Sequence, residues 1–130
     1  MNAAWVQAIL YYVVALLAGF VGLFLFQKLT RFDDWKEIGR GNVAAALASG
    51  GQILGLAHVI HTAILGNQHV LGTLMWAGIG FVLQVIGWFV FDLITPFKND
   101  QEIAKGNVAV GTMVAIVTLA LSHVVAAVIA

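Results

Sequence analysis

The chain has no cysteine, and only 9% of its 130 residues are charged. The absence of cysteine excludes disulfides and thiolate chemistry, and it leaves the redox compartment undetermined. Soluble domains carry about 25% charged residues, so the shortage of charge excludes water as the main solvent of this chain. Hydrophobic residues account for 62% of the sequence, and the mean hydropathy is +0.98. The composition therefore indicates a membrane protein.

The motifs of common soluble chemistries are also missing. No glycine-rich phosphate loop follows a strand pattern, no carboxylates are paired for acid–base catalysis, and no serine–histidine–aspartate set is plausible. The charged segments are short and balanced in sign, with a net charge of zero, which does not suit nucleic acid. We expect that the protein is not an enzyme and has no nucleic-acid partner.

Four apolar stretches are long enough to cross a bilayer, whose hydrocarbon core of about 30 Å requires about 20 helical residues. They lie near residues 4–27, 42–65, 70–95 and 107–129. The first stretch lacks the positive flank and the cleavage site of a signal peptide, so we interpret it as a membrane helix. We expect an all-α membrane protein in which residues 1–130 form a single integral membrane domain.

The charged residues fall in two windows, Lys28–Arg40 and Asp92–Lys105. The first window holds four of the six lysines and arginines, and the second holds the other two. Loops rich in lysine and arginine stay on the cytoplasmic side of a membrane. We therefore expect both windows in the cytoplasm, with the two termini and the turn near residues 66–69 outside.

The two windows contain the same motif, Glu37–Ala44 and Glu102–Ala109, at a spacing of 65 residues (102 minus 37). This spacing predicts an internal repeat of approximately residues 1–65 and 66–130. Each half is expected to be a helical hairpin, and both hairpins have the same orientation because two helices separate the copies. The predicted architecture is a four-helix bundle formed by a tandem parallel repeat, related by an axis along the membrane normal.

Each motif contains residues suited to ending one helix and starting the next. Its glycine suits a left-handed residue after a helix, its asparagine can cap the following helix, and its glutamate can pair with a basic residue three positions later. These residues are Glu37, Arg40, Gly41 and Asn42 in the first copy and Glu102, Lys105, Gly106 and Asn107 in the second. They either cap and anchor helices only, or also form a cytoplasmic vestibule or a docking surface.

Two weaker signals predict short helices inside the charged windows. Thr95 followed by Pro96 is typical of a helix start, with threonine as the N-cap and proline at the first helical position. In the first window, a short helix through Phe32, Trp35 and Ile38 could place its apolar side in the membrane interface.

The doubled motif, present as Glu37–Ala44 and Glu102–Ala109 in a small four-helix chain, resembles the domain of unknown function 350 family over nearly the whole sequence. The resemblance implies a tandem pair of two-helix units in a bacterial inner membrane. It also implies a link to membrane-stress systems of the phage-shock type, and hence a cytoplasmic partner. It implies no activity and no catalytic residue.

A few polar residues lie within the apolar stretches. His58 and His123 each follow the asparagine of their motif by 16 residues (58 minus 42 and 123 minus 107), which places both about 24 Å from the cytoplasmic end. They could ligate a haem or a metal ion, pass protons, or simply form hydrogen bonds near the headgroups. His61 shares a face with His58, and Asp92 lies at the inner end of the third helix. We expect no cofactor.

Other polar and small residues suggest contacts between helices. Ser49, Gln52 and Gln84 could form interhelical hydrogen bonds, and Gly51 with Gly55 could allow two helices to approach closely.

Two functions follow as hypotheses. In the first, the protein is an oligomeric scaffold or adaptor in the bilayer whose cytoplasmic turns recruit a soluble protein partner. In the second, a homo-oligomer forms an ion or proton channel with the glutamates and asparagines of the motifs at its inner mouth.

Overall fold

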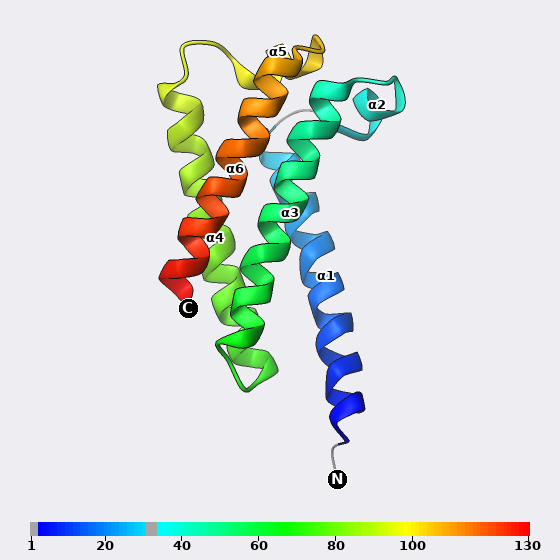
Figure 1. Ribbon diagram of the computed structural model, residues 1–130, viewed down its shortest axis with the longest axis vertical. Coiled ribbons are helices and arrows are strands. Elements are labelled where there is room, and N and C mark those ends of the chain that lie inside the picture. The colour runs from blue at the N-terminus through cyan, green and yellow to red at the C-terminus, as the bar shows by residue number, and fades with distance from the viewer. Residues whose placement is uncertain (1–2, 31–33) are drawn as a thin grey trace.

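Six helices make up the part of the chain that the structure describes, and this part contains no strand (Figure 1). The computed structural model describes residues 3–30 and 34–130. The helices are, in chain order, α1 (Ala4–Thr30), α2 (Asp34–Gly39), α3 (Val43–Leu65), α4 (Val70–Ile94), α5 (Asn99–Ala104) and α6 (Val108–Ile129).

The long helices α1, α3, α4 and α6 are each long and apolar enough to cross a membrane. Their lengths are 27, 23, 25 and 22 residues, which correspond to about 33–40 Å. These values exceed the hydrocarbon thickness of about 30 Å. The four predicted apolar helices are therefore confirmed, with ends that differ from the prediction by a few residues.

The long helices run side by side, and the short helices α2 and α5 lie together at one end of the bundle (Figure 1). We call this the charged end, because the described acidic and basic residues belong to α2, α5, the turns beside them and the last turns of α1 and α4. The start of α1 and the turn between α3 and α4 lie at the opposite end (Figure 1). The acidic and basic side chains of the described residues are thus gathered at one end.

The helices α3 and α6 form the closest contact in the bundle, and they run beside each other (Figure 1). A Cβ atom built on Gly51 would lie 2.6 Å from the Cα of Ala115, and one built on Gly111 would lie 2.5 Å from the carbonyl oxygen of Ala44. Only glycine permits backbones to approach this closely, as in other membrane helix pairs with small residues at the contact. The predicted role of Gly51 is confirmed, and Gly55 faces Ser122 across the same interface.

Two groups of buried side chains fill the bundle. The larger group lies toward the charged end, where the ring of Trp88 packs against those of Phe26 and Phe91 at centroid distances of 6.2 Å and 5.7 Å. The smaller group, Val59, Ala63, Val125 and Ile129, lies toward the other end. Both groups contain side chains from α3 and α6, so these two helices form the centre of the bundle.

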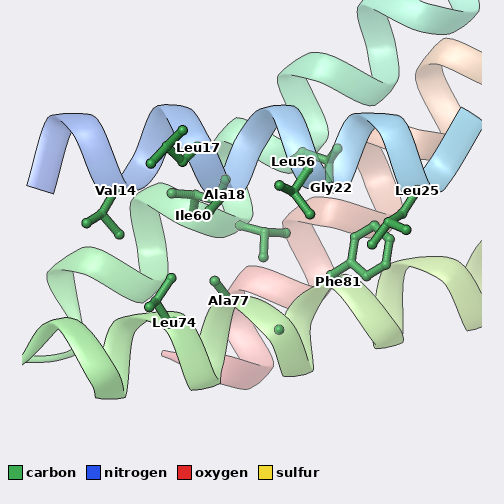
Figure 2. Close-up of a pocket in the computed structure, with 13 residues that line it drawn as sticks. Val14, Leu17, Ala18, Gly22, Leu25, Leu56, Ile60, Leu74, Ala77 and Phe81 are labelled. Carbon is green, nitrogen blue, oxygen red and sulfur yellow. The ribbon is translucent and has the colours of Figure 1, made fainter.

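In contrast, α1 lies at the periphery. Only 11% of the apolar span of α1 is buried, against 50% of the span of α3. A cavity of about 460 Å³ separates α1 from α3 and α4, and apolar residues such as Leu17, Ile60 and Phe81 line it (Figure 2). In a membrane the exposed sides of α1 face lipid, so this exposure does not destabilise the fold as it would in water.

The prediction of a helix start at Thr95 and Pro96 is wrong. Thr95 is instead the C-cap residue of α4, and its backbone N–H donates to the carbonyl of Phe91. Helix α5 begins at Asn99, with Lys98 as its N-cap. Proline stops α4 because it cannot continue the helical hydrogen bonding, and residues 95–98 link α4 to α5. Helix α2 contains Trp35 and Ile38 as predicted, whereas Phe32 lies outside the described residues.

Candidate functional site

The turn between α2 and α3 closes through a Schellman motif. Gly41 has a φ angle of +85°, a conformation that glycine adopts without steric cost. The backbone N–H of Gly41 donates to the carbonyl of Ile38 at 2.9 Å, and that of Asn42 donates to the carbonyl of Glu37 at 3.0 Å. The Oδ1 atom of Asn42 then accepts a hydrogen bond from the backbone N–H of Ala45 at 3.1 Å. This capping of α3 confirms the predicted roles of Gly41 and Asn42.

The turn between α5 and α6 repeats this geometry. Gly106 has a φ angle of +84°, and its N–H donates to the carbonyl of Ile103 at 2.9 Å. The N–H of Asn107 donates to the carbonyl of Glu102 at 3.0 Å, and Oδ1 of Asn107 accepts from the N–H of Val110 at 3.4 Å. Each motif contains the hydrogen-bond donors and acceptors that close its turn. The same residue types therefore form the same turn in both places.

Side chains reinforce both turns. The amide nitrogen of Asn42 donates to Oε2 of Glu37 at 3.3 Å, and Arg40 Nη1 lies 3.5 Å from Oε1 of the same carboxylate. In the second turn, Asn107 donates to Oε2 of Glu102 at 3.1 Å. The ammonium of Lys105 lies 3.7 Å from Oε1 of Glu102. The ion pairs expected from the spacing are therefore present.

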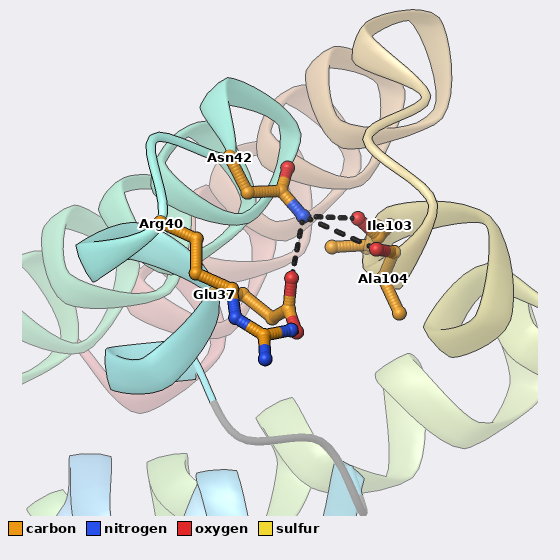
Figure 3. A network of polar contacts seen from close by, with 5 residues as sticks. All are labelled: Glu37, Arg40, Asn42, Ile103 and Ala104. Carbon is orange, nitrogen blue, oxygen red and sulfur yellow. Dashed lines mark hydrogen bonds and ion pairs between the residues drawn. The ribbon is translucent and has the colours of Figure 1, made fainter.

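One contact joins the two turns and has no counterpart in the symmetric position. The amide nitrogen of Asn42 also donates to the carbonyl oxygen of Ile103 at 2.8 Å and lies 3.5 Å from that of Ala104 (Figure 3). These carbonyls belong to the C-terminal turn of α5, where backbone oxygens lack helical partners. Asn107 forms no such bond to α2 among the described residues. Sequence reasoning missed this contact because its partners are 61 residues apart.

The carboxylates of the turns are half-buried, while their basic partners project outward. Side-chain exposure is 19% for Glu37 and 64% for Arg40, and it is 29% for Glu102 and 70% for Lys105. Exposed ion pairs of this kind contribute about 0–1 kcal/mol to stability. The pairs therefore do little to hold the fold, and they leave a guanidinium and an ammonium group accessible at the charged end.

The asymmetry of the asparagines leads to a prediction. Asn42→Ala is expected to lower the free energy of unfolding by about 2 kcal/mol, because it removes an N-cap and a hydrogen bond to α5. The matched change Asn107→Ala removes only the cap and the local bond, and it should cost about 1 kcal/mol. Unfolding of the detergent-solubilised protein with increasing dodecyl sulfate, followed by circular dichroism, measures both values. Equal losses would show that the contact with Ile103 contributes nothing.

The structure brings three of the histidines together at the surface of α3 and α6. The rings of His58 and His123 are stacked with centroids 5.5 Å apart and planes inclined by 16°. The ring of His61 stacks on His58 at 6.2 Å. His58 is half-buried and the other two are exposed. The predicted proximity of His58 and His123 is thus confirmed, and the described residues contain no group of three or more histidine and acidic side chains with a geometry for metal binding.

Several polar side chains are buried inside the bundle. The amide nitrogen of Gln84 donates to the carbonyl oxygen of Thr118 at 3.0 Å, which confirms the interhelical bond expected of Gln84. The side-chain oxygens of Ser49, Gln52 and Gln84 are buried without a hydrogen-bond partner among the described residues. The expectation that Ser49 and Gln52 bond to other helices is therefore not met. Thr118 was not singled out from the sequence.

Asp92 lies in the last turn of α4, as expected, and is exposed. Its Oδ1 atom accepts a hydrogen bond at 3.0 Å from the amide nitrogen of Asn99, which is completely buried. Asn99 was not predicted as a site residue, because only the tertiary structure places the start of α5 beside the end of α4.

The fold and the turns define a small all-helical protein with four potential membrane helices and two capped, charged turns at one end. The chain belongs to the family described as Domain of Unknown Function (DUF350), whose model matches residues 1–129. This confirms the resemblance drawn from the repeated motif.

Two relatives have been compared with the chain. It is 42% identical over 123 residues to the UPF0719 transmembrane protein YshE of Bacillus subtilis strain 168, covering 94% of this chain and 92% of that protein. It is 26% identical over 110 residues to the UPF0719 inner membrane protein YjfL of Escherichia coli strain K12, covering 85% and 83%. No solved structure matches the chain.

Proposed function

We propose that the protein is a non-enzymatic, homo-oligomeric membrane scaffold whose two charged turns recruit a soluble protein partner, as part of a membrane-stress response. The observation that carries the proposal is the position of the charge. All six basic and six acidic residues lie in two windows, and Arg40 and Lys105 project from rigid turns. The remaining surface is largely apolar, so a soluble partner can form charged contacts only at this end.

The proposal places the charged end in the cytoplasm and both termini outside a bacterial inner membrane. The distribution of lysine and arginine supports this orientation, and the relative from Escherichia coli is named an inner membrane protein. Green fluorescent protein fused to the C-terminus should therefore show no fluorescence in cells, because it does not fold into its fluorescent form when it is exported across the inner membrane. A fluorescent fusion would place the C-terminus in the cytoplasm and contradict the proposed orientation.

The proposal also includes a tandem parallel repeat of two hairpins. The equal order of elements, α1–α2–α3 and α4–α5–α6, and the equal φ angles of Gly41 and Gly106 support it. Oligomerisation would place several pairs of turns side by side and raise the avidity for a partner that binds each pair weakly.

The docking role can be tested by a pull-down from native membranes. Glu37→Gln combined with Glu102→Gln removes one carboxylate from each turn, which frees the basic groups and changes the charge seen by a partner. We expect at least a tenfold loss of the co-purifying soluble protein, equivalent to about 1.4 kcal/mol. Asp92→Asn combined with Asp100→Asn removes the same charge from the same end of the molecule but outside the turns, and it should retain the partner. Full retention by the first variant would reject the turns as the docking site.

The channel hypothesis is supported by buried polar groups in the bundle, because Gln52 and Gln84 carry buried oxygens without partners among the described residues. Pores can use neutral oxygens to replace the hydration of an ion. Purified protein in proteoliposomes should then conduct ions or protons above the level of empty vesicles. An absence of flux at every pH tested would exclude this second function.

The histidines do not fit the haem hypothesis. The rings of His58 and His123 are stacked on each other, so they do not flank a porphyrin as two axial ligands would. We propose instead that they form hydrogen bonds near the headgroups. The purified protein should therefore show no Soret band, and a Soret band that is lost in His58→Ala would overturn this assignment.

A further inference from the structure

An open cavity of about 850 Å³ lies at the charged end, away from the two capped turns. It is formed by the end of α1, the end of α4, the linker after α4, and α5. Lys28 lies in the last turn of α1 and Asp92 in the last turn of α4. The cavity is therefore at the depth where two membrane helices leave the hydrocarbon, which is the depth of the lipid headgroups.

Groups of both signs line this cavity, and they are not paired with each other. Lys28 and Lys98 supply two ammonium groups, and Asp92 and Asp100 supply two carboxylates. The ion pairs seen between described residues involve none of these four side chains. The ammonium of Lys28 instead lies 5.3 Å from the centre of the Phe24 ring. Two cations and two anions are thus available to a ligand.

One of the carboxylates is held in place. Oδ1 of Asp92 accepts a hydrogen bond from Asn99 at 3.0 Å, and the same amide nitrogen lies 3.3 Å from the hydroxyl of Thr95. Asn99 is completely buried, so its side chain is fixed by the surrounding residues. Its hydrogen bond therefore orients the carboxylate of Asp92. Orientation by a buried partner lowers the entropy that a ligand must remove on binding.

The two carboxylates of this cavity have no counterpart at the equivalent positions of the first half of the sequence. In the first half, the residue that corresponds to Asp92 is Gln27, and the residue that corresponds to Asp100 is Trp35 (each 65 positions earlier). The repeated helix–turn–helix structure forms without these carboxylates. The first half instead has a carboxylate, Asp34, at the position of Asn99. The second half therefore differs in having its carboxylate at the position that lines the cavity.

We propose that this cavity binds the headgroup of a phospholipid that carries both a phosphate and a primary ammonium group, the phosphatidylethanolamine class. The lysines attract the phosphate, and the carboxylates accept hydrogen bonds from the ammonium, as is typical of charge-assisted pairs. A purely anionic headgroup would face the repulsion of Asp92 and Asp100. The aromatic side chains of Phe89 and Phe97 also line the cavity and are exposed, as is common for aromatic residues at the membrane interface.

Tryptophan, the best ring for an aromatic cage around a quaternary ammonium group, is poorly accessible in this cavity. Trp88, its only tryptophan, is 6% exposed, and its ring packs against Phe26 and Phe91. A choline headgroup also lacks the N–H donors that the carboxylates can accept. The geometry therefore favours ethanolamine over choline.

Native mass spectrometry of the full chain in detergent tests this proposal. The protein is mixed with equal amounts of phosphatidylethanolamine, phosphatidylglycerol and phosphatidylcholine with identical acyl chains. We expect phosphatidylethanolamine to be retained at least about fivefold more than either of the others. Equal retention of the three lipids, or preferred retention of phosphatidylglycerol or phosphatidylcholine, would overturn the proposal without any variant.

Variants then locate the site. Asp92→Asn with Asp100→Asn should reduce the retention of phosphatidylethanolamine to the level of phosphatidylglycerol, because the ammonium loses its acceptors. Glu37→Gln with Glu102→Gln is the matched control, since it removes two carboxylates from the same end, and it should keep the preference. An unchanged preference in the first variant, or an equal loss in the control, would place the binding elsewhere. The helical signal in circular dichroism confirms that each variant is folded.

Discussion

Replacing Gly111 by alanine is expected to lower the free energy of unfolding by about 1–3 kcal/mol, the usual cost of forcing extra volume into a packed interface. The added Cβ would lie 2.5 Å from the carbonyl oxygen and 2.6 Å from the Cα of Ala44. Both are backbone atoms, which cannot rotate away as the end of a side chain can. Helices α3 and α6 must therefore separate, and their contact forms the centre of the bundle.

Gly51 makes the reciprocal contact from α3. Its Cβ would lie 2.6 Å from the Cα of Ala115, so Gly51→Ala should cost a similar 1–3 kcal/mol, about as much as Gly111→Ala. The residue beside it provides a matched control, because nothing lies within 4 Å of a Cβ at Gly50. Gly50→Ala should leave stability unchanged or raise it by up to about 1 kcal/mol through its higher helix propensity.

Dodecyl sulfate titration of the detergent-solubilised variants, followed by the helical circular dichroism signal, measures these differences. The midpoint should fall for Gly51→Ala and Gly111→Ala and should not fall for Gly50→Ala. If Gly51→Ala and Gly50→Ala unfolded at the same midpoint, the close approach of α3 and α6 would be wrong.

Gly41→Ala is the second substitution with a large expected effect, about 1–2 kcal/mol of lost stability. Gly41 has a φ angle of +85°, and nothing lies within 4 Å of a Cβ placed there. The cost therefore arises from the backbone conformation and not from a clash. Asparagine tolerates the left-handed region better than alanine does, so Gly41→Asn should recover part of the loss.

The control for this effect lies two residues earlier. Gly39 is also free of neighbours within 4 Å, but it is the last residue of α2 and has no positive φ angle. Gly39→Ala should be neutral in the same titration. A loss for Gly39→Ala as large as that for Gly41→Ala would show that the backbone angle does not control the turn.

The local features of the turns could be predicted from the sequence because their partners are close along the chain. Gly41 and Asn42 close their turn with carbonyls no more than five residues away, and Glu37 meets Arg40 after three residues. Asparagine and glycine have strong conformational preferences at helix ends. The same patterns in the second copy produced the same geometry. The start of α5 was predicted wrongly because Thr95 and Pro96 suit the end of one helix as well as the start of another.

The apolar stretches likewise determined the number of long helices, since each must bury its backbone polar groups within a helix to cross hydrocarbon. The spacing of 65 residues between the two motifs does not reveal which helices are neighbours in the bundle. The central place of α3 and α6 depends on Gly51 and Gly111 meeting backbone atoms of the other helix. Because α3 and α6 pack against each other at the centre, α1 lies at the periphery.

By itself, then, the sequence determined the apolar helices, the capped turns between them and the gathering of charge at one end. These features depend on hydropathy and on hydrogen bonds between residues close in the chain. Only the tertiary structure decided the pairing of α3 with α6, the bond from Asn42 to Ile103 and the cavity that contains Asp92 and Lys28. Each of these requires residues at least 60 positions apart to meet, and the free energy that brings them together belongs to helix packing and not to any local pattern.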